Sequence, residues 1–281
     1  MSAVAPIQGR DALTYLFVPG DRPERFQKAL DTGTDVVIID LEDSVAPGNA
    51  GMALENAVAA ITSPSKIQAL IRVHSATTEL FKDELSAIAD AVSTSESGLL
   101  GLVLAKAETA EHIAEVVRRL PVGSVVIPLI ESAVGLLRAY ELAAVPGVAR
   151  LAFGAVDFSL DIGGASTDDD LSYARSHLVV ASRAARVTAP VDSPSLNISD
   201  TSVVEHAARR AKSRGFGGML AIHPAQLAPI RRGFSPSDEE VRWAREVLEV
   251  EGGAAQVHGR LVDRPVFDKA HAILNARKEQ K

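Results

Sequence analysis

The chain has 281 residues, of which 47% are hydrophobic and 23% charged, an ordinary balance for a globular protein of one large domain or two small ones. Its net charge of −7 at pH 7 argues against a nucleic-acid partner, which requires a concentrated basic face, and against an anionic membrane surface. Cysteine is absent, which excludes disulfides, thiolate metal sites and a cysteine nucleophile. The N-terminal stretch MSAVAPIQGRDALTYLF is not a secretory signal, and we expect a cytoplasmic protein.

Eight short apolar runs alternate with longer segments of helical period. In chain order they are TYLFVPG from Thr14, VVIIDLED from Val36, ALIRVH from Ala69, LLGLVLAKAE from Leu99, VVIPLIES from Val125, RLAFGAVD from Arg150, APVDS from Ala189 and GMLAIHP from Gly218. The steps between them average about 29 residues, close to the length of one strand–helix–strand unit. Eight such units in one block predict an α/β protein with the (β/α)8 TIM-barrel fold.

An open doubly wound sheet is the alternative architecture for this alternation. Its first turn usually carries a glycine-rich phosphate loop, whereas the first turn here is VPGDRPERF. The barrel is therefore favoured, over residues 10–233. The remaining residues, 234–281, are more than one closing helix needs, and the stretch SPSDEEVRWAREVLEVE predicts a C-terminal helical extension.

Polar side chains stand at the predicted strand ends, where barrel enzymes carry their active sites. They are Glu42 and Asp43 after the second strand, Arg72 on the third, Lys106 and Glu108 after the fourth, Glu131 after the fifth, Asp157 after the sixth and His223 after the eighth. Each alone could be a solvated or ion-paired charge, but an arginine and several acids converging on one mouth favour function. Glu131 and Asp157 hold equivalent positions on consecutive strands, and two carboxylates with few other ligands suit Mg²⁺.

Other chemistries are less well supported by the sequence. A zinc site is disfavoured because the histidines lack ligand spacing. A serine hydrolase is disfavoured because the G-x-S-x-G nucleophile elbow is absent. A Schiff-base aldolase remains the alternative enzyme class, with Lys106 as the nucleophile.

Eight motifs spread over the chain from about Tyr15 to Leu274 resemble those of a known family. They are LFVPGDRPERFQKA, IIDLEDSV, IRV, LAKAE, PLIES, AFGAVDF, AIHPAQL and GRLVDRP. Their order is similar to that in the citrate lyase β-subunit-like branch of the HpcH/HpaI aldolase/citrate lyase family. This resemblance implies a (β/α)8 barrel and a homo-oligomer, with a trimer favoured. It also implies a Mg²⁺-dependent carbon–carbon lyase of the retro-aldol or retro-Claisen type.

The implied substrate is a 2-hydroxyacyl thioester of CoA or an acyl carrier, such as a citryl, malyl or citramalyl thioester, with a 2-oxo or 2-hydroxy acid as the partner molecule. Three motifs depart from the family's pattern: Leu13-Thr14 replaces Arg-Ser, His74 replaces Asn and Ala105 replaces Pro. These positions border the substrate and thioester region and leave the metal residues unchanged.

The resemblance also implies roles for individual residues. Glu131 and Asp157 would hold Mg²⁺, and Glu131 would also contact the substrate. Arg72 would bind the substrate and stabilise the developing enolate. Glu42 and Asp43 would order metal-bound waters and Arg72.

Two further roles follow for the substrate and the extension. Gly154 and Ala155 would bind the substrate through their backbone amides, as an oxyanion site does. Asp263 in GRLVDRP would come from a neighbouring subunit as a base, so that the extension, residues 234–281, packs on that subunit. The alternatives are a malyl-type acyl-CoA thioesterase on the same site, or a subunit of a citrate-lyase-like complex without independent activity.

Overall fold

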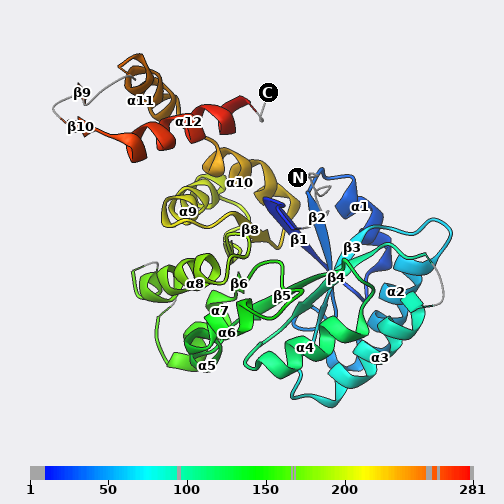
Figure 1. The fold of residues 1–281 in the computed structure, drawn as a ribbon. Helices are drawn as coiled ribbons and strands as arrows, with labels where there is room; N and C mark the ends of the chain where they lie inside the picture. The colour runs from blue at the N-terminus through cyan, green and yellow to red at the C-terminus, as the bar shows by residue number, and fades with distance from the viewer. Residues whose placement is uncertain are drawn as a thin grey trace.

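The computed structural model describes residues 10–93, 96–165, 167, 169–250, 255–257 and 260–278. Eight parallel strands form a closed barrel in the order β1 to β8 (Figure 1). They are β1 (Thr14–Pro19), β2 (Val36–Asp40), β3 (Ala69–Val73), β4 (Leu99–Leu104), β5 (Val125–Ile130), β6 (Ala152–Phe153), β7 (Val191–Asp192) and β8 (Gly218–Ala221). Each strand begins at the expected residue or shortly after it, and the TIM-barrel prediction is confirmed.

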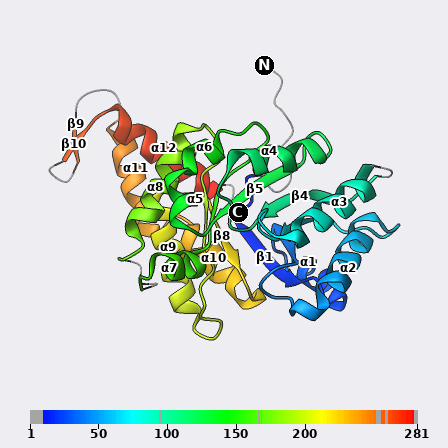
Figure 2. The ribbon, with the colours of Figure 1, turned by 90° about the horizontal axis from the view of Figure 1, so that it is seen from below.

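Helices surround the barrel, as the two ribbon views in Figures 1 and 2 show. They are α1 (Phe26–Leu30), α2 (Ala50–Thr62), α3 (Glu79–Ser93), α4 (Ala110–Arg119), α5 (Ala133–Leu137), α6 (Ala139–Ala143), α7 (Ala155–Ile162), α8 (Ser172–Ala184), α9 (Thr201–Arg214) and α10 (Leu227–Phe234), with short 3₁₀ turns η1 (Pro23–Arg25), η2 (Pro47–Asn49) and η3 (Pro224–Gln226). Within the described ranges, no helix combines the length and apolar character that crossing a membrane requires.

Strand alternation divides the core of the barrel into two layers. In β2, Ile38 belongs to the cluster inside the barrel, whereas Val37 belongs to the cluster under the helices. Because side chains alternate between the two faces of a strand, the next inward position of β2 is Asp40. The same alternation turns Arg72 of β3 and Glu131, directly after β5, toward the mouth. The period of the strands thus places charged groups above an apolar barrel interior.

The end of the barrel opposite the mouth is closed by Arg150, which is 0% exposed. Its guanidinium donates to the carbonyl oxygens of Ala12 and Ala189, both at 2.8 Å, and to the hydroxyl of Tyr15 at 3.1 Å. A buried cation is tolerated only when such donors are satisfied.

The C-terminal extension forms its own small unit beyond the barrel (Figure 1). It contains α11 (Asp238–Glu249), an antiparallel hairpin of β9 (Ala255–Val257) and β10 (Arg260–Val262), and α12 (Arg264–Lys278). A capping box between Ser237 and Glu240 begins α11. A separate apolar cluster that includes Val247, Val262 and Ala270 holds α11 and α12 together. Of the glycine-containing stretch GGAAQVHG between α11 and α12, residues 252–254 and 258–259 lie outside the described residues.

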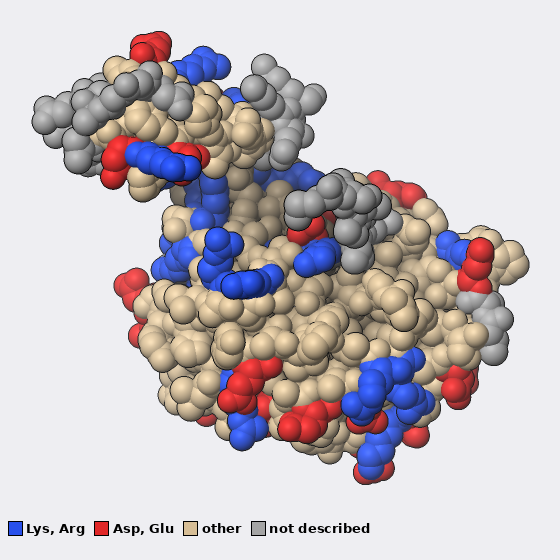
Figure 3. Space-filling model, in the orientation of Figure 1, with Lys and Arg blue, Asp and Glu red and all other residues tan. Residues whose placement is uncertain are grey.

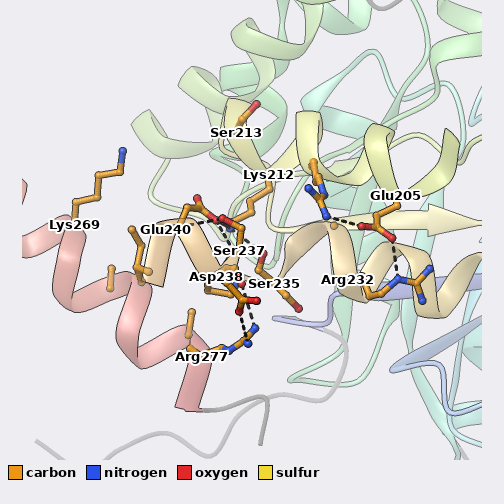
Figure 4. Close-up of a pocket in the computed structure, with 16 residues that line it drawn as sticks. Glu205, Lys212, Ser213, Arg232, Ser235, Ser237, Asp238, Glu240, Lys269 and Arg277 are labelled. Carbon is orange, nitrogen blue, oxygen red and sulfur yellow. Dashed lines mark hydrogen bonds and ion pairs between the residues drawn. The ribbon is translucent and has the colours of Figure 1, made fainter. Parts of the chain in front are cut away.

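The extension leaves the barrel at the end where the strands begin. Near the end of α10, Arg231 donates to the carboxylate of Asp35 at 2.7 Å and to the carbonyl of Gly33 at 2.8 Å, just before β2. A groove of about 930 Å³ separates α9 and α10 from α11 and α12 (Figure 4). Lys212 spans this junction to Glu240 at 3.2 Å, and Figure 3 shows basic side chains gathered there.

Candidate active site

A cavity of about 430 Å³ opens at the carboxyl ends of the barrel strands. Its polar lining consists of Asp40, Asp43, Ser44, Arg72, Glu131, Asp157 and Ser193. Apolar side chains, including Phe17, Leu196 and Ile222, line the rest. The structure therefore brings the expected arginine and both expected metal ligands into one cavity.

Arg72 is held in a fixed orientation by a buried carboxylate on the neighbouring strand. Asp40 and Arg72 are register partners in β2 and β3. The guanidinium donates to the two oxygens of Asp40 from Nε at 2.6 Å and from Nη2 at 2.7 Å. Ser44 donates a further hydrogen bond to Asp40, and the ring of Phe17 lies 4.7 Å from the guanidinium carbon. This bidentate geometry fixes the plane of the guanidinium group.

The charge of Arg72 is stabilised by this environment. Burial lowers the pKa of Arg72, but the hydrogen bonds and charge of Asp40, together with the nearby acids, raise it above its ordinary value. Burial also raises the pKa of Asp40, and the hydrogen bonds from Arg72 more than offset that, leaving it below the usual range. Both groups are therefore ionised at neutral pH.

Glu42 and Asp43 lie beside Arg72, as the resemblance implies. Arg72 Nη1 is 3.2 Å from Glu42 Oε2 and 3.2 Å from Asp43 Oδ2. Lys106 Nζ lies 2.6 Å from Glu42 Oε1. Burial raises the pKa of Glu42, although Arg72 and Lys106 partly offset it. Glu42 is thus shared between two cations at the edge of the mouth.

Glu131 is the most strongly perturbed acid of the site. It is 4% exposed, and burial, followed by repulsion from Glu42, raises its pKa to about 8. One oxygen accepts a hydrogen bond from the backbone amide of Lys106 at 2.9 Å. The other side of its carboxylate faces Gly154, where a Cβ atom would lie 2.3 Å from Oε1. Glu131 therefore fits only because residue 154 lacks a side chain.

Asp157 stands in the first turn of α7, directly after the turn that contains Gly154. Its carboxylate is 32% exposed and lies 3.7 Å from Lys106 Nζ. The amide of Gly154 donates to Ile130 at 3.0 Å, and the amide of Ala155 donates to Ser193 Oγ at 2.7 Å. Both residues line the cavity, their N–H groups donate within the protein, and their role in substrate binding stays a prediction.

The donor set fits a magnesium ion. In the parts of the chain that the structure describes, no three His, Asp or Glu side chains converge as a complete protein ligand set. Mg²⁺ prefers oxygen and keeps several waters, so it requires only one or two carboxylates from the protein. A cation beside Glu131 would also favour the ionised form that burial disfavours. Glu131 and Asp157 are the residues that would hold it.

Lys106 pairs with carboxylates at the mouth, which favours its charged form. It has a left-handed backbone conformation with φ of 48°, uncommon for a residue other than glycine. Burial lowers the pKa of Lys106, but its hydrogen bond to Glu42 and the surrounding carboxylates raise it above the ordinary value. A Schiff-base nucleophile requires a neutral amine, so the geometry disfavours that alternative.

Several polar residues expected near the strand ends take other positions. Glu108 accepts a hydrogen bond from Ser132 at 2.6 Å. His223 is exposed and accepts the amide of Ala225 at 3.1 Å. His74 lies 2.6 Å from the buried Glu84. None of the three lines the described mouth cavity.

Asp263 is also remote from the mouth of its own chain. It is exposed, and its carbonyl oxygen accepts the amides of Val266 and Phe267 at the start of α12. The extension that carries it leaves the barrel at the opposite end from the mouth. Asp263 therefore does not join the other predicted residues within one chain.

Sequence reasoning missed two residues that shape the site. Asp40, in the run VVIIDLED, was given no role, yet it makes the shortest contacts to Arg72, and its inward position could have been read from strand alternation. Ser193 follows β7, where the run APVDS was recognised only as a strand. Its hydroxyl forms hydrogen bonds to the turn beside both candidate metal ligands.

Comparison with known proteins places these features in a family context. The family model described as HpcH/HpaI aldolase/citrate lyase matches residues 13–224. The chain is 33% identical over 270 residues to a citrate lyase subunit beta-like protein of Mycobacterium tuberculosis, covering 92% of this chain and 93% of that one. It is 31% identical over 306 residues to an L-malyl-CoA/beta-methylmalyl-CoA lyase of Cereibacter sphaeroides, covering 96% and 95%.

A solved structure extends this similarity to three dimensions. The crystal structure of the protein CitE from Mycobacterium tuberculosis, in complex with magnesium, acetoacetate and coenzyme A, has a TM-score of 0.82 and 32% sequence identity. The match covers 96% of this chain and 99% of that chain. It includes both the barrel and most of the extension.

Proposed function

Because the chain belongs to the HpcH/HpaI aldolase/citrate lyase family, we propose that it is a Mg²⁺-dependent carbon–carbon lyase acting on a CoA thioester of a 2-hydroxy acid, such as a malyl or citramalyl thioester, in which the hydroxyl group stands on the carbon β to the thioester carbonyl. The observation that carries this function is the convergence of Arg72, Glu131 and Asp157 on one cavity. A relative named as a malyl-CoA lyase and a neighbouring structure that contains magnesium, acetoacetate and coenzyme A support the same chemistry.

In the cleavage direction, the substrate hydroxyl loses a proton and the bond to the carbon next to the thioester carbonyl breaks. The products are a 2-oxo acid and the enolate of an acyl thioester, which takes up a proton. When bound, Mg²⁺ supplies a Lewis acid for the carboxylate and the neighbouring oxygen of the 2-hydroxy acid. The protein residues orient the substrate and stabilise the charge that develops as the bond breaks.

Arg72 would donate hydrogen bonds to the substrate oxygen on which that negative charge develops. Of its five N–H groups, three donate to Asp40 and Asp43, which leaves one on each terminal nitrogen outside these bonds, and Nη1 also lies 3.2 Å from Glu42 Oε2. Because Asp40 already fixes the guanidinium plane, little reorganisation is needed when the substrate binds. Glu42 and Asp43 keep Arg72 in place and order water around the metal.

The extension supplies the base to a second copy of the chain. We propose that residues 10–233 form the barrel and that residues 234–281 pack on a neighbouring subunit in a homotrimer, with Asp263 at that subunit's mouth. The position of Asp263 away from its own mouth supports this arrangement. Large exposed apolar side chains, among them Leu137 at 73% and Leu160 at 76%, mark surface for another subunit to cover.

Subunit mixing tests the shared site. Inactive Asp263→Asn and Asp157→Asn proteins should partly regain activity on subunit exchange, since mixed oligomers contain some sites with both residues intact. Each variant mixed with wild type is the control for exchange. If verified mixed oligomers of the two variants stay inactive while the control mixtures are active, Asp263 does not act across the interface.

The substrate and the reaction are tested by a screen of hydroxyacyl-CoA thioesters for Mg²⁺-dependent release of a 2-oxo acid. Glu131→Ala and Asp157→Ala should abolish both turnover and Mg²⁺ binding without unfolding the chain. Release of free CoA without carbon–carbon cleavage would instead indicate the thioesterase.

We place the protein in the cytoplasm and favour CoA over an acyl-carrier protein. The intact charges at the mouth disfavour a silent subunit.

A further inference from the structure

A buried hydrogen-bond network of polar side chains lies under the turn between β6 and α7. It runs from Arg175 of α8 through Asp192 of β7 to Ser193. The side chains of Arg175 and Asp192 are 11% and 6% exposed, and Ser193 is 5% exposed. Buried polar groups are costly unless they are hydrogen-bonded, and a satisfied network rigidifies the structure around it.

Ser193 binds the turn on both sides of Gly154. Its hydroxyl donates to the carbonyl oxygen of Phe153 at 2.7 Å and accepts the amide of Ala155 at 2.7 Å. One side chain thus joins the last residue of β6 to the first residue of α7. The second bond also satisfies an amide of the first helical turn, which has no partner within the helix.

Ser193 is itself held in place by Asp192 and, through it, by Arg175. Asp192 Oδ1 accepts the amide of Ser193 at 2.8 Å. Arg175 Nε donates to both oxygens of Asp192, each at 3.0 Å. The guanidinium of Arg175 also lies 5.3 Å from the ring centroid of Phe153, so it contacts β6 as well as β7.

Both candidate metal ligands depend on the turn that Ser193 holds. Glu131 packs against Gly154 so closely that a Cβ atom there would lie 2.3 Å from Oε1. Asp157 belongs to the first turn of α7, which begins at Ala155. A shift of this turn would therefore move Asp157 and change the space available to Glu131.

We propose that Ser193, supported by Asp192 and Arg175, is a positioning residue that sets the separation of Glu131 and Asp157 for Mg²⁺. This inference rests on the proposed metal-dependent function and deepens it. Residues that hydrogen-bond the surroundings of metal ligands, without touching the metal, typically change metal affinity or activity about 10- to 100-fold when they are removed. Ser193 should fall in that range.

The test is calorimetric Mg²⁺ binding by the full-length protein, with Ser193→Ala, Ser193→Thr and a matched control. Ser193→Ala should weaken Mg²⁺ binding at least about 10-fold, and Ser193→Thr, which keeps the hydroxyl, should restore most of it. Ser182→Ala is the control. This serine of α8 is 1% exposed, and within the described chain its hydroxyl has no hydrogen-bond partner.

The outcomes separate this inference from the proposed function. Wild-type Mg²⁺ affinity in Ser193→Ala, or equal losses in Ser193→Ala and Ser182→Ala, would overturn the positioning role while leaving the lyase intact. Failure of threonine to rescue would also overturn it. Failure of the wild type itself to bind Mg²⁺ would overturn both. If Ser193→Ala does not fold, Ser193→Cys, whose thiol is a weak hydrogen-bonding group, takes its place with the same expected loss.

Discussion

Adding one methyl group at Gly154 should disable the metal site while the protein still folds. In Gly154→Ala the new Cβ would lie 2.3 Å from Oε1, 2.5 Å from Cγ and 2.8 Å from Cδ of Glu131. Non-bonded atoms pack comfortably at about 3.5 Å or more, so the carboxylate must retreat by roughly 1 Å. Residue 154 has φ of −106°, which alanine adopts freely, so the effect is steric and not a backbone strain.

A displacement of this size is large for a metal site, where ligand distances must hold within about 0.2 Å. Overpacking of this kind costs about 1–3 kcal/mol of stability, whereas a misplacement of about 1 Å can cost about 100-fold in turnover. We expect calorimetry to show Mg²⁺ affinity lowered at least about 10-fold and thioester cleavage lowered about 100-fold.

The matched control is Gly51→Ala. Gly51 lies in the exposed part of α2 and has nothing within 4 Å of an added Cβ, so alanine there should stabilise the helix by up to about 1 kcal/mol and leave activity unchanged. The reasoning fails if Gly154→Ala binds Mg²⁺ and cleaves its substrate as the wild type does.

Three further outcomes follow from the same contacts. Arg72→Lys keeps the charge but cannot engage both oxygens of Asp40, so turnover should fall about 100-fold; near-normal kinetics would make Arg72 structural. Borohydride with pyruvate should leave the protein mass unchanged, because Lys106 is protonated; a reduced adduct would restore the Schiff-base alternative. The hydrogen bond to Glu84 raises the pKa of His74. The stability that this hydrogen bond adds to the folded protein is therefore fully present below about pH 6.5, the ordinary pKa of histidine, and is lost as the pH rises through the raised pKa of His74. The difference in Tm between wild type and His74→Gln should shrink from pH 6 to pH 9, and a constant difference would contradict this role.

The parts of the site that follow strand periodicity were predictable from the sequence. The repeat of apolar runs predicted all eight strands, and the inward alternation turns Arg72 and Glu131 to the mouth. Asp157 follows from its equivalent place after the next strand. These positions follow from the two-residue alternation of side chains along each strand, together with the rule that active sites occupy the carboxyl ends of barrel strands.

The contacts that orient those residues were not predictable in the same way. Ser193 bonds to Ala155 across 38 residues of sequence, and Lys106 reaches Glu42 across 64. Such pairs depend on how strands and turns meet in space, and in Lys106 on an unusual backbone conformation. The hydrogen bond from the Ala155 amide to Ser193 is likewise a contact that no sequence motif indicated.

The distribution of charge explains why so many acids can crowd one mouth. Arg72 is held by Asp40 at 2.6 and 2.7 Å, and Lys106 is held by Glu42 at 2.6 Å. These two pairs neutralise one side of the mouth internally. Glu131 and Asp157 remain on the other side, where Lys106 is 3.7 Å from Asp157 and Glu131 has a pKa of about 8. A divalent cation is attracted to that side, because there it favours the ionised form of Glu131 that burial disfavours.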